Sequence, residues 1–139
     1  MSAEKLIEDS RRWLRQAQAD LKAARSSRDN GSNEWASFQA QQAAEKAMKA
    51  LWFFSGHDPW GHSIAKLIID FPDGALKTRI EPLTADAKAL DKLYITTRYP
   101  NGLPDMIPAE VYTSDESREA IIRSETIVSF IDAIISQKP

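Results

Sequence analysis

The sequence lacks cysteine, has few glycines and contains no long apolar run. The absence of cysteine excludes disulfides and thiolate chemistry. The five glycines are scattered, and none has the spacing of a phosphate-binding loop. No apolar stretch approaches the roughly 20 residues that span a bilayer, and the start of the chain, Met1 to Lys5, does not resemble a signal peptide. We therefore expect a cytoplasmic protein that does not contact a membrane.

Side chains for the common kinds of catalysis are also scarce. His57 and His62 are the only histidines, and neither belongs to a metal-binding motif such as His-Glu-x-x-His. No serine lies in a strand–turn–helix elbow of the kind that activates a nucleophile. The formal net charge of −2 argues against strong nucleic-acid binding, which depends on cations that neutralise phosphates. The sequence thus predicts no metal site and no enzyme of the usual hydrolytic kinds.

The composition is that of a single globular domain covering residues 1–139. Hydrophobic residues make up 42% of the chain and charged residues of both signs 27%. A chain of this length buries enough apolar surface to form one core without disulfides or metals. The sequence therefore predicts neither a disordered tail nor a second domain.

Apolar residues recur at helical spacing along most of the chain. In the first helix, expected from about 3 to 27, they lie at intervals of three and four residues. A second helix is expected from an N-cap at Asn33 to about Ser55, where Gly56 ends it. Its many alanines leave room for a neighbouring helix to approach closely. Trp13, which lies on the first apolar face, is expected in the core or at an interface.

The second half of the sequence predicts shorter helices and one long terminal helix. We expect helices over about 63–70 and 84–97, and a stiff non-helical connection from Pro100 to Pro108. Thr113 and Glu116 form a capping box at the start of the last helix, which continues to about Gln137. The fold class is therefore all-α, an antiparallel up-and-down bundle of four to five helices.

Four blocks in this order resemble the HEPN (higher eukaryotes and prokaryotes nucleotide-binding) domain family. They are Trp13–Ala17, Phe38–Leu51, His62-Ser63 and Leu90–Pro100. The resemblance covers essentially the whole chain, and it is the combination of blocks that is specific. Several segments, among them Arg12–Ala17 and Thr97–Pro100, are also similar to the C-terminal HEPN domain of sacsin, a very large eukaryotic chaperone-like protein.

The resemblance implies a helical bundle that commonly forms a homodimer. Many HEPN proteins are ribonucleases, often toxins, with an Arg-x(4–6)-His motif on a late helix. Here Arg98 has no histidine after it, and no arginine lies four to six residues before His57 or His62. The binding functions of the family are therefore expected instead. These are capture of a nucleotide such as GTP or ATP or of a polyphosphate, with no required cofactor, and partnership with a chaperone or a nucleotidyltransferase.

Seven residues are candidates for nucleotide binding. Arg98 either offers its donor fork to a phosphate, with Tyr94 or Tyr99 stacking on the base, or it bonds the last carbonyls of its helix. Other candidates have an equally plain structural interpretation as solvated or packing residues; they are Arg15, Lys46, Lys49 and His62.

Two alternatives to nucleotide binding remain open. The alanine-rich second helix and the isoleucine-rich last helix fit a protein-interaction module that binds no ligand. A ribonuclease that brings His62 and Arg98 together in space is the other alternative. In addition, Gln42 lies on the apolar face of its helix, where a buried amide needs a hydrogen-bonding partner.

Overall fold

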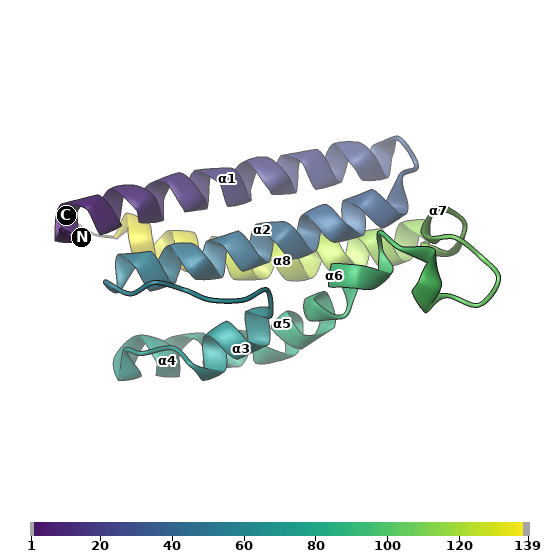
Figure 1. The fold of residues 1–139 in the computed structure, drawn as a ribbon. Coiled ribbons are helices and arrows are strands. Elements are labelled where there is room, and N and C mark those ends of the chain that lie inside the picture. The colour runs from purple at the N-terminus through teal and green to yellow at the C-terminus, as the bar shows by residue number, and fades with distance from the viewer. Residues whose placement is uncertain (1, 138–139) are drawn as a thin grey trace.

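Three long helices form the body of the molecule, and short helices cover one side of it (Figure 1). The computed structural model describes residues 2–137, and the long helices in it are α1 (Ala3–Asp29), α2 (Asn33–Phe54) and α8 (Ser114–Ser136). α2 packs against both α1 and α8, and α1 also contacts α8. α1 begins and α8 ends at the same end of the bundle.

α1 buries the face that the sequence predicts and extends two residues beyond the expected end. Ser2 caps its start by accepting a hydrogen bond from the backbone N–H of Lys5 at 3.1 Å. The buried stripe runs from Ser10 to Ala24. Within this stripe the Ser10 hydroxyl donates to the carbonyl of Ala50 in α2 at 2.8 Å, so its burial leaves no unpaired donor.

α2 lies at the centre of the bundle, and its alanines explain how closely its neighbours approach. All six, Ala36, Ala40, Ala43, Ala44, Ala47 and Ala50, are fully buried. The helix ends where expected, with Gly56 in the left-handed region at φ 90°. The expected N-cap was wrong: Ser32 precedes the helix, and Asn33 is its first residue. The Asn33 side chain instead accepts a hydrogen bond from the Ser117 hydroxyl in α8 at 2.9 Å.

The segment between α2 and α8 holds more helices than the sequence predicts. α3 (Ile64–Ile69) matches the expected helix over 63–70. α4 (Gly74–Ile80) was not expected, although Asp73 caps it by accepting from the N–H of Leu76 at 3.0 Å. It leads through the 3-10 helix η1 (Glu81–Leu83) into α5 (Thr84–Asp91).

The expected helix over 84–97 is divided, and the stiff connection is partly helical. A break at Lys92 separates α5 from α6 (Leu93–Thr96). The stretch that follows begins with the 3-10 helix η2 (Pro100–Gly102) and ends where α7 (Pro108–Val111) starts, so the expected non-helical connection is confirmed for residues 103–107 and was wrong at its two ends. A proline is well placed in the first turn of a helix, where its missing N–H would have no partner.

α8 confirms the expected capping box and apolar stripe. Thr113 accepts from the N–H of Glu116 at 3.1 Å, and the Glu116 carboxylate accepts from the N–H of Thr113 at 3.0 Å. The residues predicted on the stripe are all buried: Ile121, Ser124, Ile127, Val128, Ile131, Ile134 and Ile135. Residues 2–137 contain no strand, and the fold is an all-α bundle as predicted. Among these residues no helix combines the length and the apolar character that crossing a membrane requires.

Candidate functional site

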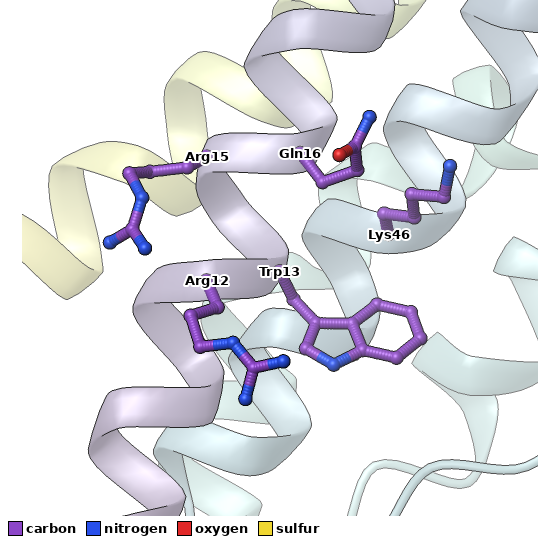
Figure 2. A pocket seen from close by; sticks show the side chains of 5 residues that line it. All are labelled: Arg12, Trp13, Arg15, Gln16 and Lys46. Atoms are coloured by element: carbon purple, nitrogen blue, oxygen red, sulfur yellow. The ribbon is translucent and has the colours of Figure 1, made fainter.

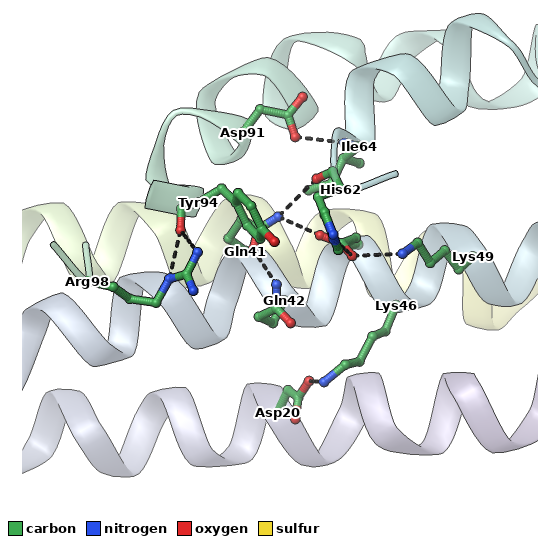
Figure 3. A network of polar contacts seen from close by, with 11 residues as sticks. Asp20, Gln41, Gln42, Lys46, Lys49, His62, Ile64, Asp91, Tyr94 and Arg98 are labelled. Carbon is green, nitrogen blue, oxygen red and sulfur yellow. Dashed lines mark hydrogen bonds and ion pairs between the residues drawn. The ribbon is translucent and has the colours of Figure 1, made fainter. Parts of the chain in front are cut away.

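The structure places six of the seven predicted binding residues in two groups and the seventh, Lys49, between them. Arg15 and Lys46 line a groove between α1 and α2, hereafter the α1–α2 groove. Tyr94, Arg98 and Tyr99 lie elsewhere, where the Arg98 guanidinium contacts the rings of Phe38, Tyr94 and Tyr99. His62 belongs to this second group because it stacks on Tyr94, with ring centroids 4.8 Å apart. Lys49 lies between the two, on the α2 face shown in Figure 3.

The α1–α2 groove is a shallow cavity of about 490 Å³ with basic and aromatic walls (Figure 2). α1 contributes Arg12, Trp13, Arg15 and Gln16, and α2 contributes Lys46. In Figure 2 the side chains of Trp13 and Gln16, three positions apart, extend toward Lys46, whereas that of Arg15 extends from the opposite side of α1.

The three cations of the groove differ in whether they already pair with a carboxylate of the protein. Lys46 donates to the Asp20 carboxylate at 2.6 Å, and Arg12 donates to Asp9 at 3.0 Å. Arg15 is exposed, and among residues 2–137 no side chain or carbonyl accepts a hydrogen bond from its guanidinium. Arg15 is therefore the cation in this groove that is free to bind an added anion.

Trp13 forms the apolar wall of the groove. Its half-buried indole packs on Phe53 at a centroid distance of 5.6 Å, and the Lys49 ammonium lies 5.8 Å from the ring. In the described part of the chain no acceptor contacts the indole N–H. Trp13 thus combines the expected packing role with a polar edge that is free to meet a ligand.

Arg98 occupies the centre of the second group. Together with the rings of Phe38, Tyr94 and Tyr99 it forms what is hereafter called the arginine cluster. Its guanidinium carbon lies 4.3 Å from the ring centroid of Phe38, 4.7 Å from that of Tyr94 and 5.2 Å from that of Tyr99. Its Nε and Nη2 both donate to the Tyr94 carbonyl. This arrangement corresponds to the structural interpretation, in which Arg98 caps the end of its own helix.

A buried polar network lies next to the arginine cluster (Figure 3). Glu45, only 4% exposed, accepts from Lys49 at 3.0 Å and from the Gln41 amide at 3.1 Å. The Nδ1 atom of His62 lies 3.2 Å from the same carboxylate. Sequence reasoning missed Glu45, because a lone glutamate in an alanine-rich helix usually faces solvent.

The buried amide is that of Gln41, not that of Gln42. Gln41 is fully buried, whereas Gln42 is half-buried and donates to the Gln41 side-chain oxygen at 2.8 Å. The expected single apolar face does not apply, because helices pack on α2 from several sides. Gln42 does have the buried partner that its position requires, so this part of the prediction is confirmed.

Asp91 is a further residue that sequence reasoning missed. Its carboxylate accepts from the backbone N–H groups of Ile64 and Ala65 at 2.7 and 3.1 Å, and from the Ser63 hydroxyl at 2.7 Å. These bonds hold the start of α3 against the end of α5 and thereby position His62. Asp91 lies between Lys88 and Lys92 in the sequence, where a carboxylate usually faces solvent, so residue spacing contains no signal for this role.

The HEPN domain family model matches residues 10–134 of this chain. The chain belongs to the HEPN domain family. Among curated proteins it is similar to human sacsin, with 28% identity over 138 residues that cover 94% of this HEPN chain. The chain spans only 3% of the length of sacsin.

Solved structures of prokaryotic proteins share this HEPN fold. TT1696 from Thermus thermophilus is 41% identical, with a TM-score of 0.82 over 89% of this chain and 96% of that protein. The archaeal HEPN homologue ST0689 is 34% identical, with a TM-score of 0.74 over 91% and 97%. A HEPN domain protein from Thermotoga maritima is 30% identical, with a TM-score of 0.68 over 91% and 99%.

Proposed function

We propose that this HEPN domain binds a nucleoside triphosphate, GTP or ATP, in the α1–α2 groove and does not cleave it. The observation that carries the proposal is the guanidinium of Arg12 next to the indole of Trp13, with Lys46 on the facing helix (Figure 2). Guanidinium groups present a planar fork of donors that matches phosphate oxygens. Indole rings stack on nucleobases of any identity, which adds affinity without selecting one base.

The size and layout of the groove fit such a ligand. Its volume of about 490 Å³ lies within the range of small-molecule sites in proteins. Trp13 offers the base an apolar surface, while Arg12, Arg15 and Lys46 offer the phosphates positive charge. The arginine cluster is a weaker candidate, because Arg98 already directs two donors at a carbonyl of its own helix.

The absence of catalysis is part of the proposal. The Arg-x(4–6)-His motif of HEPN ribonucleases does not occur in the sequence. His62 and Arg98 do contact the same Tyr94 ring, which is the observation in favour of an unconventional ribonuclease. If these residues cleaved RNA, the wild type would cleave a short labelled RNA and His62→Ala would not. We expect no cleavage by either the wild type or His62→Ala.

Calorimetry with GTP, ATP and GMP tests the nucleotide proposal. We expect micromolar binding of both triphosphates and weaker binding of GMP. The double variant Arg12→Ala/Arg15→Ala should bind GTP at least about tenfold less tightly, because two charge-assisted contacts are lost. Arg118→Ala is the matched control, since it removes an exposed arginine from α8. A folded wild-type sample that shows no heat at high micromolar ligand would refute the proposal.

Dimerisation has separate support from an exposed apolar segment. Ile95, Tyr99, Met106 and Ile107 are each 46–50% exposed, and they lie within a short stretch of the chain. Apolar side chains gathered at a surface commonly mark a protein interface. We propose that this segment serves in a homodimer, or in docking to a chaperone or nucleotidyltransferase partner.

Light scattering at tens of micromolar tests the dimer. We expect a mass of two chains for the wild type and of one chain for Ile107→Glu. A wild-type monomer at this concentration would contradict the proposal. If light scattering shows the dimer and calorimetry shows no nucleotide binding, the chain is better described as an interaction module that binds no ligand.

A further inference from the structure

One carboxylate at the edge of the α1–α2 groove already occupies two of the groups that line it. Asp20 accepts from the Lys46 ammonium at 2.6 Å through Oδ2 and from the Gln16 amide at 2.8 Å through Oδ1. Figure 3 shows the first of these bonds reaching across from α2 to α1. Gln16 and Asp20 are four residues apart and therefore share a face of α1.

The Lys46–Asp20 pair is more sheltered than an ordinary surface ion pair. The Asp20 side chain is 15% exposed and that of Lys46 is 26% exposed. Salt screens charges in such partly buried positions less than it screens exposed ones. By contrast, the other carboxylate near the groove, Asp9, pairs with the exposed cations Arg12 and Lys5.

A phosphate that enters the groove must compete with Asp20 for Lys46. Lys46 has three N–H donors but one charge, and a second anion beside Asp20 meets a like charge at short range. Arg15 has no such competitor among residues 2–137. A ligand that binds Lys46 must therefore bring enough negative charge to displace Asp20, and a chain of several phosphates carries more charge than a single phosphate.

We infer that Asp20 is an internal competitor for the phosphate chain and lowers the affinity of the groove for ligands whose phosphates reach Lys46. This inference rests on the proposed nucleotide binding and names the residue that regulates it. The opposite role would be that Asp20 holds Lys46 and Gln16 in the geometry that the ligand needs. The two roles predict opposite signs for removal of the Asp20 charge.

Asp20→Asn tests the inference because it removes the charge and keeps the shape and one acceptor oxygen. Calorimetry with GTP and GMP is run on wild type, Asp20→Asn, Lys46→Ala and the double variant. We expect Asp20→Asn to bind GTP about fivefold more tightly, which corresponds to removal of one like charge near the phosphates. The gain should be absent when Lys46→Ala is compared with Lys46→Ala/Asp20→Asn.

Asp70→Asn is the matched control. It also removes one carboxylate that pairs with a lysine, but at the exposed end of α3. Its GTP affinity should equal that of the wild type. An unchanged or weaker affinity in Asp20→Asn, or a gain that persists without Lys46, would overturn the inference and leave the nucleotide site intact. Absence of GTP binding in both wild type and Asp20→Asn would instead refute the proposed function, and the inference with it.

Discussion

The α1–α2 groove and the arginine cluster contain the same kinds of side chain but use them differently. In the arginine cluster the guanidinium of Arg98 is surrounded by three rings and bonded to a carbonyl. In the groove the guanidinium of Arg15 is exposed and no described residue accepts from it. An arginine is therefore available to a ligand only where the protein has left its donors unused.

The same comparison separates the lysines. Lys49 is 11% exposed and bonded to the buried Glu45, so its charge stabilises the protein interior. Lys46 is more exposed, and its partner Asp20 lies at the edge of the groove. The residues with structural roles and those with binding roles should accordingly respond in different ways to mutation, one set in stability and the other in affinity.

The largest effect on stability is expected from Glu45→Ala. It removes the hydrogen-bonding partner of the Lys49 ammonium and one of the two acceptors of the Gln41 amide, at a cost of about 2–4 kcal/mol in the free energy of unfolding. Urea denaturation measures this change. Glu125→Ala is the control, because its partner Arg25 is half exposed and the loss should stay below about 1 kcal/mol. Equal losses in the two variants would show that the network is not structural.

A smaller loss of stability is expected from Arg98→Ala. Removal of its hydrogen bonds and ring contacts should lower the free energy of unfolding by about 1–2 kcal/mol. Arg98→Lys should restore little, because an ammonium cannot reproduce the planar contacts. GTP affinity should change less than about twofold. A large drop in affinity at unchanged stability would instead place the ligand at the arginine cluster.

The smallest change in stability is expected from Arg15→Ala. Arg15 is exposed and makes no hydrogen bond to residues 2–137, so the free energy of unfolding should stay within about 0.5 kcal/mol of the wild type. GTP affinity should nevertheless fall about tenfold, because a charge-assisted contact to phosphate is lost. Denaturation and calorimetry on one preparation check both numbers, and unchanged affinity would remove Arg15 from the site.

The sequence predicted the fold well because long helices carry periodic signals. The buried stripes of α1 and α8 and the Thr113–Glu116 capping box follow from residue spacing within one helix. The short helix α4 was missed because its seven residues are too few to show a period, even though Asp73 supplied a cap.

The site was less predictable, because it depends on contacts between helices. Arg15 and Lys46 were named from the sequence, but the groove that both line appears only when α1 and α2 are packed. Three carboxylates contact partners that lie 17 to 28 positions away in the sequence. Asp20 contacts Lys46, Glu45 contacts His62, and Asp91 contacts Ser63, Ile64 and Ala65. No local spacing rule reports partners at that distance.

A nuclear magnetic resonance titration with GTP that compares two indoles locates the nucleotide site directly. The Trp13 indole N–H lies at the groove without an acceptor among residues 2–137, whereas that of Trp52 donates to the Leu67 carbonyl at 3.1 Å. We expect GTP to shift the Trp13 indole and Arg15 signals and to leave those of Trp52 and Arg98 unchanged. Shifts centred on Arg98 and Tyr94, or no shift at Trp13 at saturating GTP, would contradict binding in the α1–α2 groove.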